Sequence, residues 1–190
     1  MELRDAIRQR RSVRRYTDQP VPRELLERLL EDACWAPSAE NYQPWHFVVL
    51  TKAEDIASLQ ETLRLSAEAL TPVLTERFPN YPQVVKETTA FIRTLGGAPV
   101  CVLVFLRQRY PHRETVLVSV AAAVENLLLS ACDAGLGACW IGAAVNCGYD
   151  EAVTKRFGPE GGELAAMISL GYPAHTPNAP RRKPGRWEIR

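Results

Sequence analysis

The sequence lacks the cysteine pattern of a disulfide-stabilised protein and the histidine pattern of a metal site. Its five cysteines are an odd number, no two form a CxxC pair, and all lie in apolar or helical surroundings: Cys34, Cys101, Cys132, Cys139 and Cys147. Such a set favours free thiols in a reducing cytoplasm. The three histidines lie too far apart for metal-ligand spacing: His46, His112 and His175. We therefore expect neither a disulfide framework nor a metal site.

The sequence also lacks a run typical of a membrane span or a secretion signal. The longest apolar stretch, from Val116 to Cys132, is interrupted by polar residues: Ser119, Glu125, Asn126 and Ser130. Such residues are disfavoured in the hydrocarbon core of a bilayer, so we do not expect a span here. The first fifteen residues are charged and contain no apolar core. We therefore expect no signal peptide.

An excess of charge of one sign is absent, but basic residues gather at both chain ends. The formal net charge is +1, which by itself favours no acidic partner. The first fifteen residues hold six arginines, and the last ten residues hold five basic residues. The distribution of charge is therefore more informative than its total.

The length of 190 residues fits a single domain, 1–190, with a core large enough to be stable. Apolar residues at helical spacing predict helices over 3–9, 22–33, 53–75, 83–94, 115–134 and 150–157. Short apolar runs rich in β-branched residues predict strands over 46–50, 100–106, 138–141 and 164–170. Strands and helices alternate irregularly, which favours a sheet with helices packed on its faces.

Prolines and glycines mark the segments between these elements. Pro72, Pro79 and Pro82 predict a mobile excursion between the helices 53–75 and 83–94. Gly135 and Gly137 are expected to end the helix 115–134, which is apolar nearly all round and should lie at the centre of the molecule. The segment after Gly171 is proline-rich and basic. It must be disordered or lie on another surface.

Arg10, Ser12 and Arg14 form the first candidate site. Alternate side chains of an extended segment share a face, and guanidinium groups match a phosphate because they donate paired hydrogen bonds and stay charged. The alternative is a solvated basic N-terminus or a weak nucleic-acid patch. A second basic cluster covers residues 181–183, where the alternative is again a solvated tail. If both ends meet at one phosphate, the charge distribution has a single explanation.

Two further segments could approach a flat ligand. Residues 36–47, APSAENYQPWHF, hold Ser, Asn and Gln side chains between prolines, in a loop that could grip a planar heterocycle. Residues 135–142, GLGACWIG, offer backbone without bulky side chains. They are not a dinucleotide fingerprint, because Trp140 stands where the third glycine is needed and the segment follows a helix. The alternatives are an ordinary turn and a helix end, each followed by a core strand.

Taken in order, these segments resemble the FMN-dependent nitroreductase family. The pattern runs from RRSVR at 10–14 through APSAENYQPWHF and AGLGACWIG to LGYPA at 170–174 and PRRKP at 180–184. The resemblance implies an α+β fold, a three-layer α-β-α sandwich with a mixed, mainly antiparallel sheet. It also implies an intertwined homodimer with two FMN molecules at the interface. The C-terminal arm, residues 172–190, would extend across the partner.

The resemblance also implies a role for each matching residue. Arg10, Ser12 and Arg14 would contact the FMN phosphate, the ribityl chain and the N1–O2 side of the ring, with Arg11 beside them. Arg182, with Arg181 or Lys183, would close on the phosphate. The ring's central edge would be lined by Trp140, Ile141 and Gly142. The partner subunit's loop would pack on the ring or ribityl chain through Pro37, Ser38, Ala39 and Asn41.

The implied reaction is ping-pong hydride transfer from NADH or NADPH, through FMN, to an electron-poor acceptor such as a nitroaromatic or a quinone. Gly142 and Arg14 are the expected catalytic groups, the first donating its amide to flavin N5 and the second placing charge near N1–O2. Ser119 and the basic stretch 107–113 depart from the family pattern. The excursion 53–95 is expected to cover the active site.

Two alternatives remain open. One is a specialised relative: an enoate reductase, a dehalogenase or a flavin-fragmenting enzyme. The other is a flavin-binding or nucleic-acid-binding module without turnover, because basic chain ends with nearby aromatic residues could also hold a single strand.

Overall fold

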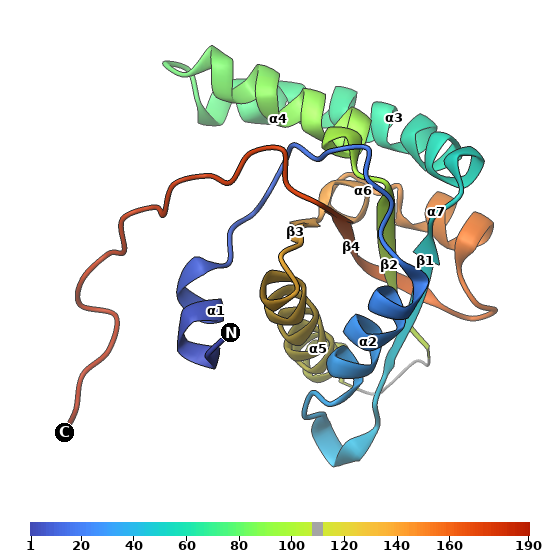
Figure 1. Cartoon of the computed structure of the whole chain (residues 1–190). Coiled ribbons are helices and arrows are strands. Elements are labelled where there is room, and N and C mark those ends of the chain that lie inside the picture. Colours follow the sequence, from blue (N-terminus) through green and yellow to red (C-terminus); the bar gives the residue numbers. More distant parts are fainter. Residues whose placement is uncertain (108–111) are drawn as a thin grey trace.

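A four-stranded sheet organises the molecule (Figure 1). The computed structural model describes residues 1–107 and 112–190. Within them the strands lie in the order β1-β2-β4-β3, every neighbouring pair antiparallel. Their bounds are β1 (Trp45–Leu50), β2 (Val100–Leu106), β3 (Gly137–Ile141) and β4 (Glu163–Gly171). Ser12 adds a parallel bridge to Ala138 on the outer edge of β3. The expected sheet is confirmed as mainly antiparallel, and within the described residues its parallel part is the single bridge of Ser12.

Helices cover both faces of this sheet, because β2 is apolar at every position and buried on both sides. Val102 and Val104 pack with α2 (Arg23–Cys34) and α5 (Arg113–Asp133) on one face. Leu103 and Phe105 pack on the other face, beneath α3 (Ala53–Arg77) and α4 (Pro82–Thr94). The smaller helices are α1 (Leu3–Gln9), α6 (Ala143–Asn146), α7 (Asp150–Phe157) and the 3-10 turns η1 (Ala39–Asn41) and η2 (Leu95–Gly97). The expected three-layer α-β-α arrangement is confirmed.

The break between the two long helices is shorter than predicted, and two of the three prolines expected in it lie within helices. Pro72 lies inside α3, which continues to Arg77, and Pro82 is the first residue of α4. Proline is well placed at that first position because its missing N–H would have no helical partner. Only residues 78–81 separate the two helices, which pack side by side above the sheet (Figure 1).

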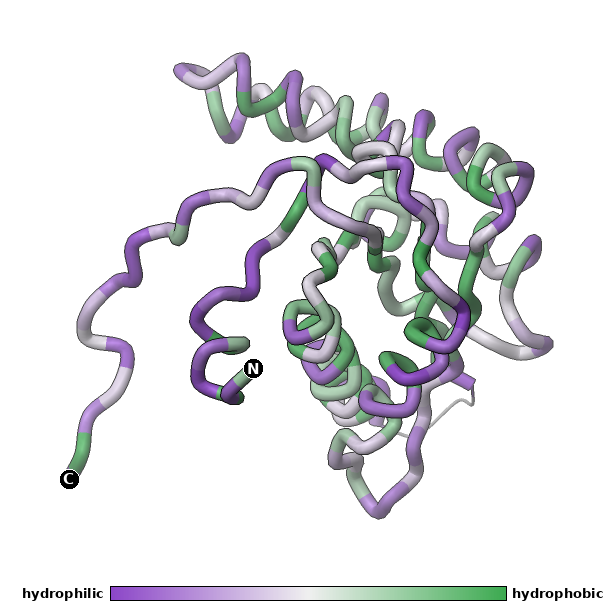
Figure 2. The backbone as a smooth tube through the Cα atoms, in the orientation of Figure 1, coloured by the Kyte–Doolittle hydropathy of each residue, from purple (hydrophilic) through white to green (hydrophobic). Residues whose placement is uncertain are grey.

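α5 is the central helix, as predicted, and part of its apolar surface is uncovered in the single chain. Among the described residues it is the one helix long and apolar enough to cross a membrane, yet it packs here against the sheet and α2. Leu127 is fully buried, whereas Val118 is 71% exposed. Figure 2 shows hydrophobic residues along most of its length.

The two glycines after α5 have different roles. Gly135 has φ +74, and the N–H groups of Gly135 and Leu136 bond back to the carbonyls of Cys132 and Ala131 at 3.1 and 2.8 Å. This is the paired bonding of a helix end closed by a left-handed residue. Gly137 does not end the helix, because it lies within β3. A Cβ there would lie 2.7 Å from the Cβ of Val13, so this glycine permits a close approach of the N-terminal segment.

Candidate functional site

The N-terminal segment, residues 10–17, docks between the outer strand and the start of the C-terminal arm. The Val13 N–H donates to the Ala138 carbonyl at 3.0 Å. The Thr17 N–H donates to the Tyr172 carbonyl at 2.9 Å, and the Arg15 carbonyl accepts the N–H of Ala174 at 3.0 Å. Backbone pairing therefore brings the two basic chain ends side by side, as Figure 1 shows in blue and red.

Tyr16 anchors this segment to the core. Its hydroxyl donates to the Val13 carbonyl at 2.6 Å and shares a 2.9 Å hydrogen bond with the Ser169 hydroxyl on β4. Burial raises the pKa of Tyr16 well above its usual value, so the phenol stays neutral. A buried hydroxyl with two partners holds the arginine segment in one register.

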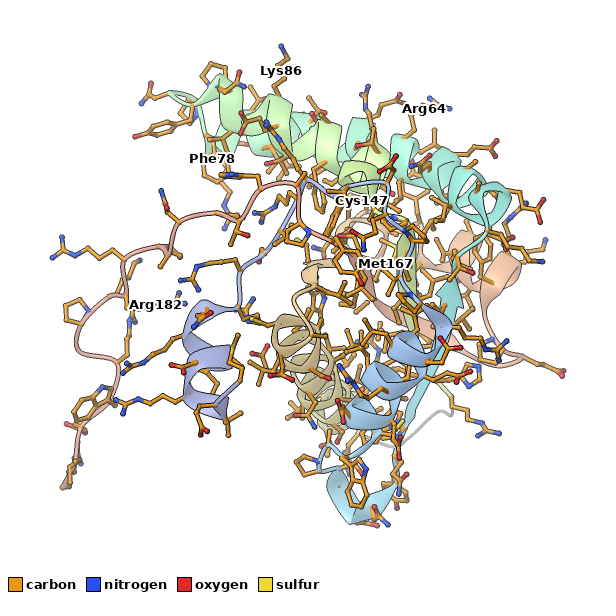
Figure 3. All side chains as sticks on the ribbon, in the orientation of Figure 1. Arg64, Phe78, Lys86, Cys147, Met167 and Arg182 are labelled. Carbon is orange, nitrogen blue, oxygen red and sulfur yellow. The ribbon has the colours of Figure 1, made fainter. Side chains whose placement is uncertain are left out.

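The basic residues of both ends line one pocket of about 370 Å³. The N-terminal side contributes Arg10, Arg11, Ser12 and Arg14. The arm contributes Arg182, together with Pro177, Asn178 and Pro180. Figure 3 labels Arg182 on the part of the arm that runs beside α1. The structure therefore brings together five of the residues that the sequence predicted to bind FMN.

The arginines of this pocket differ in how strongly they are already engaged. Arg11 donates to the carbonyls of Arg8 and Arg10 at 2.6 and 2.7 Å, which caps the end of α1. The Nε of Arg10 lies 3.5 Å from a carboxylate oxygen of Glu125. Arg14 donates to the Ser12 carbonyl at 3.3 Å and forms no ion pair with any residue that the structure describes. Arg181 does not line the pocket.

Arg14 also borders a second pocket of about 460 Å³ beneath α4. Its guanidinium carbon lies 5.7 Å from the centre of the Phe91 ring. Thr94 and Gly96, at the turn from α4 to η2, line the same pocket. The sequence pattern led us to expect the excursion 53–95, which contains α4, over the active site, but it singled out no residue of α4. The signal that could have found them is the Gly96-Gly97 pair, which marks a sharp turn of the chain directly after a helix.

The last two residues of β3, with Gly142 directly after them, lie at the end of the outer strand. Trp140 is 41% exposed, whereas the Ile141 side chain is buried in the core beneath α3. Ile141 can therefore offer a ligand its backbone but not its side chain. Gly142 precedes α6, a four-residue helix that the sequence analysis missed because it is too short to show a period. Burial raises the pKa of the neighbouring Cys139 thiol, so that thiol stays protonated.

The loop at residues 36–44 lies at the opposite end of α5. The Ala39 N–H donates to the Ser119 hydroxyl at 3.3 Å, and the Ser38 hydroxyl accepts the N–H of Gln43 at 3.0 Å. The amide of Asn41 also bonds within the loop, to Gln43, and Pro37 is exposed. Ser119 thus fixes the loop, which gives this departure from the family pattern a structural role.

Within one chain this loop and the arginine pocket lie far apart. Ser119 contacts the loop, whereas Cys132, near the other end of α5, lies beside Arg10 and Arg11. Thirteen residues of helix separate these two positions, which corresponds to about 20 Å. The structure therefore brings the N-terminal and arm residues together but does not bring the loop residues to them. Of the basic stretch 107–113, residues 108–111 lie outside the described part of the chain.

Comparison with known proteins identifies the family. The profile of the Nitroreductase family matches residues 7–172, most of the chain. The chain belongs to this family. The Bacillus subtilis protein named NAD(P)H nitroreductase YfhC is 30% identical over 187 residues, which cover 97% of this chain and 91% of that protein. A relative from Archaeoglobus fulgidus, named as an NADH dehydrogenase/NAD(P)H nitroreductase, is 33% identical over 86% of this chain and 81% of its own length.

Solved structures of flavin-related proteins share the fold of this chain. A nitroreductase from Desulfovibrio desulfuricans, crystallised in complex with FMN, is 31% identical with a TM-score of 0.73 and covers 97% of this chain and 93% of its own. A BluB-like flavoprotein from Clostridium difficile is 28% identical with a TM-score of 0.76 and covers 97% and 95%. The family expected from the sequence motifs is therefore confirmed.

Proposed function

We propose that this nitroreductase-family protein is an FMN-dependent oxidoreductase that uses NADH or NADPH to reduce an electron-poor acceptor, such as a nitroaromatic or a quinone. The observation that carries the proposal is the pocket in which both basic chain ends meet. The names of the relatives, and the FMN bound in the Desulfovibrio desulfuricans structure, support the same cofactor and reductant.

The residues of the pocket fit a phosphate monoester. Arg10 and Arg182 supply two guanidinium groups, and Ser12 supplies a hydroxyl, around a space of about 370 Å³. Guanidinium groups form paired, charge-assisted hydrogen bonds to phosphate oxygens. Their positive charges would repel one another without a ligand, so a bound dianion would stabilise the arrangement. We assign Arg10, Ser12 and Arg182 to the phosphate, with Arg181 or Lys183 completing the contact from the arm.

Bound FMN would supply the redox chemistry, accepting a hydride from the nicotinamide and passing it to the acceptor in a second step. Arg14 would hold positive charge at the N1–O2 edge, where it favours the reduced, anionic form of the ring. The Gly142 amide would donate a hydrogen bond at N5. Trp140 and the Ile141 backbone would line the central edge of the ring. These groups bind and orient, and none of them needs to exchange a proton.

A second copy of the chain completes the proposed site. Because the loop of residues 37–41 lies about 20 Å along α5 from the arginine pocket, its Pro37, Ser38, Ala39 and Asn41 would reach the flavin of a partner subunit. The uncovered apolar surface of α5 around Val118 offers a dimer contact. The arm, residues 172–190, would cross the partner, and α3 and α4, residues 53–95, would cover the active site. The five free cysteines fit a cytoplasmic protein.

The test is anaerobic reduction of the purified protein. We expect a yellow dimer that bleaches with NADH or NADPH and regains colour with a nitroaromatic or a quinone. Product analysis would reveal an enoate reductase, a dehalogenase or a flavin-fragmenting enzyme, because each gives a different product. A colourless protein that binds nucleic acid in a salt-sensitive way would overturn the proposal.

A further inference from the structure

The side chain of Arg14 is oriented by an aromatic ring. Its guanidinium carbon lies 5.7 Å from the centre of the Phe91 ring, and its hydrogen bond to the Ser12 carbonyl is long at 3.3 Å. A guanidinium above an aromatic face is attracted by the ring's electron-rich surface. Arginine otherwise has many rotamers to populate, so the ring is the main contact that selects one of them.

The Phe91 ring is itself held in place. Phe91 is 8% exposed and belongs to the core between the sheet and the two long helices. The turn after α4 lies close to both Arg14 and Phe91. A Cβ at Gly96 would lie 2.1 Å from the Arg14 carbonyl oxygen and 3.2 Å from the Phe91 ring. The Gly96 carbonyl also accepts the Tyr16 N–H at 3.1 Å. The end of α4 therefore fixes both the backbone and the side chain of Arg14.

A competing partner for Arg14 lies in the same pocket. Glu87, one turn before Phe91 on α4, lines the 460 Å³ pocket together with Arg14 and Arg15, yet forms no ion pair with either. Its carboxylate accepts the side-chain amide of Gln83 at 2.8 Å instead. Without the ring, Coulomb attraction would draw the Arg14 guanidinium towards Glu87 and away from the flavin.

We propose that Phe91 is a positioning residue for Arg14: its ring holds the guanidinium at the N1–O2 edge of the flavin and keeps it from pairing with Glu87. The inference rests on the proposed function. Through this contact α4 takes part in setting the reduction potential of the flavin, although Phe91 need not touch the cofactor.

The test measures the midpoint potential of FMN bound to the purified dimer. We expect Phe91→Leu, which keeps apolar volume but removes the ring, to stabilise the reduced flavin about tenfold less than the wild type does. That corresponds to a potential about 30 mV lower for a two-electron couple. Ile92→Val is the matched control, because Ile92 is a buried neighbour on α4 that does not line the pocket shared by Arg14 and Phe91. It should leave the potential unchanged.

Double variants distinguish an effect on the position of Arg14 from a non-specific structural change at the flavin site. In an Arg14→Gln background, Phe91→Leu should change the potential no further, because the group that it positions is absent. In the wild-type background, adding Glu87→Gln to Phe91→Leu should restore part of the lost potential. A crystal structure of Phe91→Leu should show an ion pair between Arg14 and Glu87.

An unchanged potential in Phe91→Leu, or an equal fall with and without Arg14, would overturn the inference. If Phe91→Leu does not fold, Phe91→Met provides the same loss of the ring with a more adaptable side chain. Failure of the proposed function is a separate result: a wild-type protein that holds no FMN, or holds FMN that NADH and NADPH do not reduce.

Discussion

At the residue scale, single contacts decide where the arginines lie. Arg10 and Arg14 belong to a segment whose backbone is paired with β3, with the arm and with η2. Only the residue types of this segment could be interpreted from the sequence, since its pairing depends on contacts with residues more than 75 positions away. Phe91 is the clearest example, because an apolar residue on an amphipathic helix gives no sign that a guanidinium lies over it.

The turn after α4 can be tested by adding one methyl group. Gly96→Ala should lower the free energy of unfolding by about 2–3 kcal/mol, because alanine at φ +65 is strained and its Cβ would meet the Arg14 carbonyl. Gly135→Ala is the matched control: it also has a positive φ, but its Cβ would meet nothing within 4 Å. Gly135→Ala should lower the free energy of unfolding by about 1 kcal/mol. Urea denaturation measures both, and equal losses would show that the close approach of Arg14 has no energetic consequence.

Tyr16 should make the fold sensitive to high pH. Its pKa is raised by burial, so the phenol stays protonated in the folded state while it ionises near 10 in the unfolded chain. The unfolded state then binds fewer protons, and stability falls as pH rises above about 10. Tyr16→Phe should cost about 1–2 kcal/mol at pH 7 through its lost hydrogen bonds. Its stability should fall less than that of the wild type between pH 9 and 11, and parallel curves would contradict this explanation.

At the element scale, the sequence predicted the elements whose hydrophobic pattern is strong. The expected bounds of α1, β2 and α7 match the structure. The error between α3 and α4 arose because prolines were interpreted as breaks, whereas Pro72 is exposed within α3 and Pro82 begins α4. The observed bounds of β1, α5 and β4 differ from the predicted bounds by one or two residues at one or both ends, where the hydrophobic pattern is weakest.

The exposed apolar surface of α5 leads to a prediction about assembly. Val118→Glu should shift a dimer towards monomers, because Val118 is 71% exposed in the single chain and a charge would be unfavourable inside a dimer contact. Ala152→Glu on α7 places the same charge on an exposed helical position away from α5 and should leave the dimer intact. Sedimentation velocity distinguishes the two variants. If Val118→Glu stays dimeric, this part of α5 lies outside the interface.

At the scale of the whole molecule, the basic residues of both chain ends line one pocket. The N-terminal arginines and Arg182 are separated by about 170 residues in sequence and line the same pocket. The sequence predicted this meeting because positive charge was concentrated at both ends and matched a family pattern. It could not predict which arginines remain available, since that depends on the bonds of Arg11 to α1 and the ion pair of Arg10 with Glu125.

The most direct test of this convergence compares FMN with riboflavin, which lacks the phosphate. Binding of each flavin to the apoprotein should be measured for the wild type, for Arg182→Ala and for Arg186→Ala, an exposed arginine of the arm that does not line the pocket. We expect Arg182→Ala to weaken FMN binding at least tenfold, consistent with loss of a charge-assisted hydrogen bond, and to leave riboflavin binding unchanged. Arg186→Ala should alter neither. Equal weakening of both flavins by Arg182→Ala, or no weakening of either, would contradict a phosphate held between the two chain ends.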